Sequence, residues 1–158
     1  MTGMDAMQKA LMPESPPTFC NCLALRQASR HVSQIYESHL AAEGLRASQY
    51  SILSTLGRGG AIAIGALARA MVMDRTTLGR ALRPLERDGL LEIAPGPDGR
   101  TRSLRLTPAG EAKLAAAAVR WRQAQKEFET SFGAQPAAEL RATLRQVIAL
   151  TGGRGAEE

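Results

Sequence analysis

A row of arginine and threonine side chains recurs at helical spacing in the middle of this sequence. Its members are Thr76, Arg80, Arg83 and Arg87. Steps of four, three and four residues place all of them on one face of a helix. Arginine offers forked N–H donors that match phosphate oxygens and guanine edges. The row therefore predicts a nucleic-acid contact, inserted most deeply at its amino end, with an ordinary solvated basic stripe as the alternative.

A second group of arginines lies in a loop rich in glycine and proline. Arg100 and Arg102 follow Asp98 in the stretch that begins Pro95-Gly96-Pro97. Such a loop fits over a DNA minor groove, where the negative potential favours arginine. We expect Asp98 to hold the Arg100 side chain in orientation through a charge-assisted hydrogen bond. A polar hairpin tip without a ligand is the alternative.

Two cysteines form a third candidate site. One residue separates Cys20 from Cys22, so they do not share a helix face and a bridge within one chain would be strained. Between two chains they would suit redox sensing or binding of a soft metal or metalloid. The alternative is structural, with one thiol in the core and the other partly exposed.

The histidines give little support for a metal site or for catalysis. His31 and His39 are eight residues apart, beyond the i, i+4 spacing of paired helical ligands, and we expect His39 at the surface. An enzyme using Cys22 with His31 would need them adjacent, but nine residues of helix span roughly 13 Å. No phosphate loop, serine elbow or metal-ligand motif accompanies them. The sequence thus predicts no enzyme, no metal and no cofactor.

The composition agrees with an acidic partner. Among 158 residues, 20 Lys and Arg stand against 15 Asp and Glu, a formal net charge of +5, and 17 of the 20 basic residues are arginine. Aromatic residues make up only 4%, which disfavours a base-stacking fold. No window approaches the roughly 18 apolar residues of a membrane span, and the first 17 residues lack the apolar block of a signal peptide. We expect a cytoplasmic protein with reduced cysteines and no membrane partner.

Periodicity and capping predict the elements that position these residues. Residues 1–18 contain three prolines and are expected to form a flexible arm. A helix is expected from Phe19 to Glu43, ending at Gly44. Ser48 is the expected N-cap of a second, short helix. Three glycines are expected to end that helix: Gly57, Gly59 and Gly60.

A helix-turn-helix followed by a hairpin is predicted next. A short helix over residues 64–71 and a turn at Val72-Met73 lead to a helix over 75–88, capped by Asp74 and closed by Gly89. Its buried face is expected to consist of Leu78, Ala81, Leu82 and Leu85. Pro84 lies inside it at a cost of about 3 kcal/mol, so either the helix kinks near Arg80 or packing offsets the cost.

Two strands and two further helices complete the prediction. Residues 90–94 and 103–106 are expected to form a hairpin with a long loop. Thr107-Pro108 is expected to start a long helix that ends at Gly133. Pro136 is expected to open the last helix, and residues 151–158 to form a frayed tail.

Several ordered blocks resemble the MarR family of bacterial transcriptional regulators. They are Leu45-Arg46-Ala47-Ser48-Gln49-Tyr50, Asp74-Arg75-Thr76-Thr77-Leu78, Leu85-Glu86-Arg87-Asp88-Gly89-Leu90, Asp98-Gly99-Arg100 and Leu104-Arg105-Leu106-Thr107-Pro108-Ala109-Gly110. The resemblance covers about residues 19–150. It implies a mainly α fold with a small β-hairpin wing, in which a winged helix-turn-helix at 45–107 joins dimerisation helices at 19–44 and 108–150.

The resemblance also implies a function. A homodimer would bind double-stranded DNA at a pseudo-palindromic operator, with Thr76, Thr77 and Arg80 in the major groove and Arg100 in the minor groove. Together with the residues argued above, the expected DNA-binding set is Arg75, Thr76, Thr77, Arg80, Arg83, Asp98, Arg100 and Arg102. Most such regulators are repressors, which a signal releases from DNA.

The nature of that signal stays open. Members of the family often bind small aromatic or phenolic anions between the dimer layer and the winged lobe. Candidate ligand-binding residues are Arg26, Arg30, His31, Tyr36 and Tyr50. Each has a structural alternative as a surface or core group. Thiol modification at Cys20 and Cys22 is the other signal, and an interaction adaptor that uses the fold without DNA is a further alternative.

Overall fold

A computed structural model describes residues 20–151 of the chain. The predicted arm at 1–18, together with Phe19 and residues 152–158, lies outside the described residues. The chain divides into two compact units, residues 1–33 and residues 34–158, and each is described by itself. The predicted tail is wrong at Thr151, which is the last residue of a helix. The rest of that tail lies outside the description.

The described part of the first unit consists of the start of helix α2 (Asn21–Leu40). Its side chains are mostly exposed, and Leu25 is 41% exposed. Helix α2 ends in the second unit, where one 3-10 turn, η1 (Ala41–Glu43), follows it. Gly44 then takes the left-handed φ of 68° that terminates a helix. The predicted end at Gly44 is therefore confirmed, with a tighter last turn.

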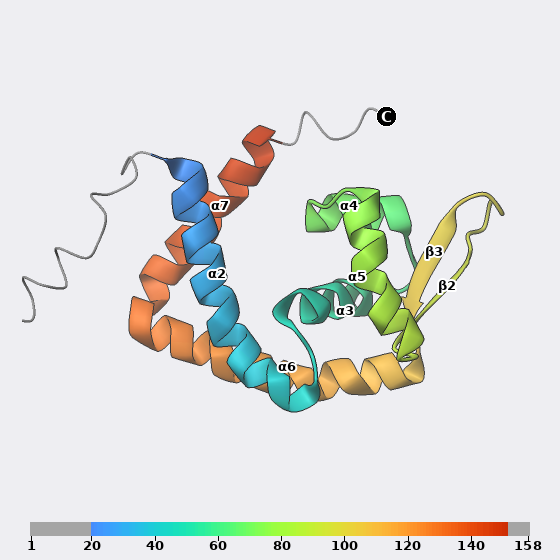
Figure 1. The fold of residues 1–158 in the computed structure, drawn as a ribbon, viewed down its shortest axis with the longest axis horizontal. Helices are drawn as coiled ribbons and strands as arrows, with labels where there is room; N and C mark the ends of the chain where they lie inside the picture. The colour runs from blue at the N-terminus through green and yellow to red at the C-terminus, as the bar shows by residue number, and fades with distance from the viewer. Residues whose placement is uncertain (1–19, 152–158) are drawn as a thin grey trace, which may run out of the picture. The chain divides into compact units, whose positions relative to one another are not determined.

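The remaining elements of the second unit follow the predicted order. In sequence they are α3 (Ala47–Gly59), β1 (Ile62–Ala63), α4 (Ile64–Met71), α5 (Arg75–Arg87), β2 (Leu91–Pro95), β3 (Arg102–Leu106), α6 (Pro108–Phe132) and α7 (Ala134–Thr151). Figure 1 shows α4 and α5 side by side, with the β2–β3 hairpin projecting beyond α5. The helix-turn-helix and its wing are thus both present.

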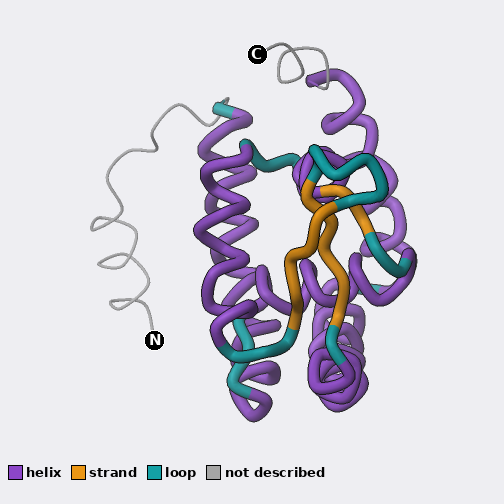
Figure 2. Tube along the Cα trace, turned by 90° about the vertical axis from the view of Figure 1, so that its right-hand side faces the viewer, coloured by secondary structure: helices purple, strands orange, loops and turns teal. Residues whose placement is uncertain are grey.

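The sheet contains one strand more than the sequence predicted. Its order is β1-β3-β2, with both pairings antiparallel, and Figure 2 shows the three strands beside the helices. In the β2–β3 pairing Ile93 faces Leu104, and the same Leu104 faces Ile62 of β1. Two residues are too few to show an alternating pattern, so β1 has no sequence signal of its own.

Helix α3 starts and ends differently from the prediction. It begins at Ala47 with Arg46 as N-cap, because the Gln49 side chain accepts the Arg46 N–H at 2.9 Å; Ser48 therefore lies inside the first turn. The helix runs on through Gly57 to Gly59. A Cβ at Gly57 would lie 2.5 Å from Leu114 Cδ2 of α6, so this glycine permits close packing of two helices.

Helix α5 continues unbroken through Pro84 to Arg87. Leu82 and Leu85 on either side of the proline are 2% and 1% exposed. Pro84 supplies no N–H to the helix ladder, but the apolar packing of its neighbours keeps the segment helical. The proline therefore does not end the helix.

The core joins the winged lobe to α6. Apolar side chains from α3, α4, α5, β2 and β3 meet there: Ile52, Leu53, Leu56, Leu67, Leu78, Leu85, Leu91 and Leu104, all at most 2% exposed. Tyr50 stacks on Trp121 of α6 with ring centroids 6.1 Å apart. Gly110 of α6 contacts the Leu90 backbone so closely that a Cβ there would lie 1.8 Å from the carbonyl oxygen.

Capping fixes both ends of α6, and α7 follows at once. Thr107 is the N-cap and accepts the Gly110 N–H at 3.0 Å, with Pro108 in the first turn, as predicted. Helix α7 begins at Ala134, two residues before Pro136, which a first turn tolerates. Among residues 134–150 only Ala137 is buried, while Leu140 and Leu150 are 36% and 86% exposed.

Candidate nucleic-acid interface

Helix α5 separates its side chains into a buried face and an exposed face. Leu78, Leu82 and Leu85 lie in the core at 0%, 2% and 1% exposure. The predicted contact residues of this helix are all exposed: Arg75, Thr76, Thr77, Arg80 and Arg83. The sequence thus predicted correctly which side of the helix is available to a partner.

The start of α5 is held by one carboxylate. Asp74 accepts the Thr77 backbone N–H at 2.8 Å and the Thr77 hydroxyl at 2.6 Å. Hydrogen bonds from the Thr77 side chain and backbone lower the pKa of Asp74 below its ordinary value of 3.8. Because Thr77 gives its hydroxyl proton to Asp74, that hydroxyl can only accept a further bond. Thr77 is therefore first a capping partner.

Asp98 acts on the loop backbone, which corrects the predicted bond to the Arg100 side chain. Its Oδ1 accepts the N–H groups of Arg100 and Thr101 at 3.0 and 2.9 Å, and the Thr101 hydroxyl at 2.7 Å. These bonds, from Thr101 above all, lower the pKa of Asp98. Sequence reasoning missed Thr101, although the Asp-x-x-Thr spacing typical of a local side-chain turn could have indicated it.

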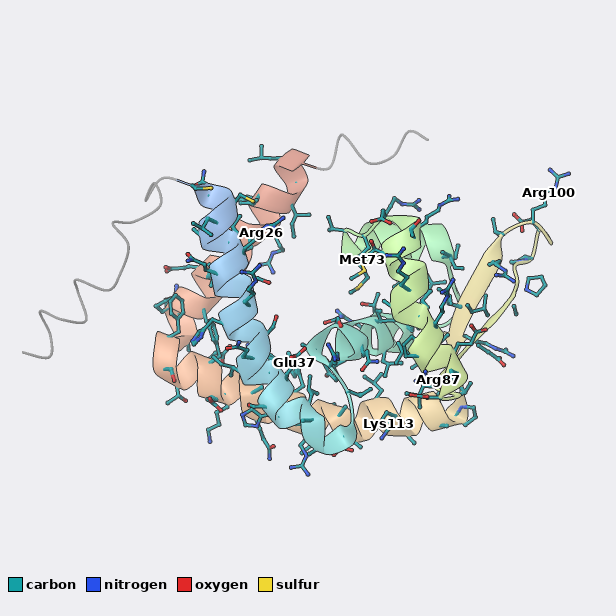
Figure 3. All side chains as sticks on the ribbon, viewed as in Figure 1. Arg26, Glu37, Met73, Arg87, Arg100 and Lys113 are labelled. Carbon is teal, nitrogen blue, oxygen red and sulfur yellow. The ribbon has the colours of Figure 1, made fainter. Side chains whose placement is uncertain are left out.

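The loop bonds leave the Arg100 guanidinium available. In Figure 3 the Arg100 side chain extends outward from the tip of the β2–β3 hairpin. Arg102 lies at the base of the same loop, at the start of β3, and is also exposed.

Most of the predicted contact arginines carry no internal counter-charge. Two other arginines of the winged lobe are paired, Arg87 with Asp88 at 3.2 Å and Arg105 with Glu92 across the β2–β3 pair. Within residues 20–151, no carboxylate forms an ion pair with the guanidinium groups of Arg75, Arg80, Arg83, Arg100 and Arg102. One helix face and one hairpin tip therefore present five uncompensated positive charges, the arrangement that a polyanion neutralises.

Comparison with known proteins agrees with this geometry. A sequence model described as the MarR family matches residues 45–100, the winged lobe through the hairpin tip. The structure of the Mycobacterium tuberculosis transcriptional regulator MosR in complex with DNA is similar, with 31% identity, a TM-score of 0.75, and 83% of this chain and 95% of that chain covered. The chain belongs to the MarR family of transcriptional regulators.

Further likenesses extend over the same part of the chain. A probable transcriptional regulator from Pseudomonas aeruginosa shares 27% identity at a TM-score of 0.74, over 82% of this chain and 97% of that one. The apo form of wild-type MarR from Escherichia coli shares the fold at 21% identity and a TM-score of 0.66, over 85% of this chain and 98% of that one. No curated protein matches the sequence. The predicted family and fold class are confirmed, and a family of transcriptional regulators is not a class of enzymes.

The predicted effector residues of this MarR-family protein have varied surroundings. Arg26, Arg30 and His31 are exposed on α2 in the first unit. In the second unit the Tyr36 hydroxyl donates to Gln125 Oε1 at 2.5 Å, and Tyr50 is only 9% exposed against Trp121. Burial raises the pKa of both tyrosines, so both remain neutral phenols at neutral pH. Tyr50 thus matches its structural alternative, a core residue.

The cysteines and His39 complete the predicted sites. Cys20 and Cys22 are free and exposed, and Cys20 Sγ accepts the Leu23 N–H at 3.4 Å in the first turn of α2. His39 lies at the surface as expected, with 25% of its side chain exposed, and its Nε2 lies 2.6 Å from Glu127 Oε2 of α6. Sequence periodicity carries no signal for a pair 88 positions apart. Within the described chain, no three His, Cys, Asp or Glu side chains cluster as metal ligands, and no helix is long and apolar enough to cross a membrane.

The capping role of Asp74 gives a prediction about acid stability. A carboxyl whose pKa is lowered by folding stabilises the fold above its unfolded pKa, and this contribution is lost as pH falls through the folded pKa. Asp74→Ala should lower the Tm at neutral pH, and the difference from wild type should shrink as pH falls below 3.8. Thermal melts across this pH range measure the difference.

Asp74→Asn is the matched control, because asparagine caps a helix without titrating. Its Tm should stay closer to wild type at neutral pH. A deficit of Asp74→Ala that is equal at every pH would contradict the role of the charged carboxylate.

Proposed function

We propose that this MarR-family protein is a homodimeric, sequence-specific DNA-binding regulator that represses transcription at a pseudo-palindromic operator. The observation that carries the proposal is the set of exposed, unpaired arginines shared by α5 and the hairpin tip. Double-stranded DNA offers both phosphates and base edges to such a set. The MosR relative, solved in complex with DNA, supports the same partner. A regulator of this kind acts where the chromosome is, in the cytoplasm.

We assign the two DNA grooves from the positions of the exposed arginines on α5 and at the tip of the β2–β3 hairpin. The amino end of α5 carries Arg75, Thr76 and Arg80, all of them exposed, and suits a major groove. The hairpin tip with Arg100 suits the adjacent minor groove, where a narrow groove attracts arginine. Asp98 contributes by fixing the loop backbone rather than by touching DNA, since its charge repels phosphate.

A second copy of the chain is the proposed cover for α7. This helix has 18 residues and buries only Ala137 among residues 134–150, with Leu140 and Leu150 exposed. Phe132 at the end of α6 is also 49% exposed. A symmetric dimer would bury such apolar side chains and set two winged lobes against two half-sites.

Removing a groove-facing arginine should weaken DNA binding without affecting folding. Arg80→Ala and Arg100→Ala should each raise the Kd for the operator by roughly 5- to 150-fold, because a good arginine–base contact is worth about 1–3 kcal/mol. Titration of a labelled operator fragment in fixed salt measures the change, and sedimentation confirms that the dimer is intact.

Arg122→Gln is the matched control, since Arg122 is exposed on α6 outside the winged lobe. It removes the same charge and should leave the Kd within about twofold. Wild-type affinity in both Arg80→Ala and Arg100→Ala would contradict the groove assignments. Absence of any DNA binding by the wild-type protein would favour the adaptor.

A signal must change the relative affinity for DNA if it is to release the operator. One candidate is a small aromatic or phenolic anion bound by the exposed residues Arg26, Arg30 and His31 of α2. The second candidate, thiol modification, is favoured by one observation. Cys20 and Cys22 are both free and exposed at the start of the 20-residue helix α2, so a thiol-reactive reagent in solution can reach them.

The thiol signal is tested by replacing both cysteines. Cys20→Ser with Cys22→Ser should keep basal operator affinity, because neither residue lies in the winged lobe. Peroxide or a thiol-reactive metalloid should weaken operator binding by the wild type and leave the double variant unchanged in the same titration. An equal response of the two proteins would exclude the cysteines as the sensing site. The small anion would then remain as the candidate signal.

A further inference from the structure

Two arginines from different helices converge on one glycine at the start of α4. A Cβ built on Gly65 would lie 3.7 Å from Arg69 Nη1 and 3.7 Å from Arg75 Nη2. The two guanidinium nitrogens are therefore separated by no more than twice that distance. Arg69 belongs to α4 and Arg75 opens α5, so the helix-turn-helix itself brings them together.

No carboxylate in the described chain neutralises this pair. Neither Arg69 nor Arg75 belongs to any of the ion pairs within residues 20–151, and both side chains are exposed. The nearest acid in sequence is Asp74, but its two oxygens are bonded to Thr77. Two like charges held this close repel each other, and an anion placed between them removes that repulsion.

We infer that Arg69 and Arg75 form a clamp for one backbone phosphate of the bound DNA, with Gly65 presenting no side chain beneath the two guanidinium groups. The inference rests on the proposed function and adds Arg69, which lies outside the predicted DNA-binding set. Both guanidinium groups would donate charge-assisted hydrogen bonds to the phosphate oxygens, a contact that the planar fork of arginine suits. Such a contact fixes the position of α5 on the duplex and reads no base.

A phosphate clamp should make DNA binding depend on salt but not on DNA sequence, whereas a base contact depends on the sequence. Each neutralised phosphate adds about 0.9 to the slope of log K against log salt. Arg69→Gln should lower that slope by at most about 0.9 and raise the Kd by up to about eightfold in 0.1 M salt, because Arg75 still contacts the phosphate. The loss should be equal for the operator and for an unrelated duplex of the same length. Arg122→Gln should leave the slope unchanged.

Gly65→Asp fills the clamp from within the protein. A Cβ at this position meets only the two guanidinium groups at ordinary contact distance, and an acid in the first turn of a helix is favourable. The variant should therefore keep or raise the Tm and yet lose DNA affinity at least as strongly as Arg69→Gln. If the arginine pair served only the fold, a variant that keeps or raises the Tm would not lose DNA affinity.

Neutral methylphosphonates, placed one at a time in the duplex, identify the phosphate. One position should weaken wild-type binding and have no effect on Arg69→Gln. If Arg69→Gln binds the operator with the salt slope and affinity of the wild type, the clamp is wrong. Operator binding by the wild type would then still support the proposed function. If Arg69→Gln instead loses only stabilisation of the DNA-free protein by inorganic phosphate, the pair binds a free anion and the DNA assignment is wrong. Wild-type protein without DNA affinity would overturn both proposals.

Discussion

The burial of three leucines beneath α5 is the interaction on which the rest of the interface depends. Leu78, Leu82 and Leu85 are packed into the core, and their spacing fixes the rotation of the helix about its axis. That rotation decides which side chains face outward. The arginine face is therefore set by apolar packing, and it persists through Pro84 because the leucines on both sides hold the helix in place.

The same packing lets the winged lobe keep charges that it does not pair. Arg87 and Arg105 have carboxylate partners, whereas the arginines at the start of α5 and at the hairpin tip have none. The two acids nearest to them, Asp74 and Asp98, bind backbone N–H groups and threonine hydroxyls instead. These carboxylates shape the helix start and the loop, and so they position arginines without neutralising them. Because these guanidinium groups are exposed to water, leaving them unpaired costs little free energy when no partner is bound.

Local signals in the sequence predicted much of this arrangement. The Asp74 cap, the helix that follows it and the Thr107-Pro108 start each depend on a few neighbouring residues, and all three are confirmed. The misses depend on distant residues or on side-chain direction. Strand β1 exists because Ile62 pairs with Leu104, and His39 contacts Glu127 of α6. The role of Asp98 and the convergence of Arg69 with Arg75 depend on where side chains point, which spacing alone does not determine.

The central claim is that two winged lobes read DNA through α5 and the hairpin tip. A hydroxyl-radical and methylation-protection footprint, on an operator selected from genomic fragments, tests it most directly. We expect two symmetric major-groove protections about one helical turn apart, each flanked by minor-groove protection that disappears in Arg100→Ala. A single unsymmetric footprint, or minor-groove protection that persists in that variant, would contradict it.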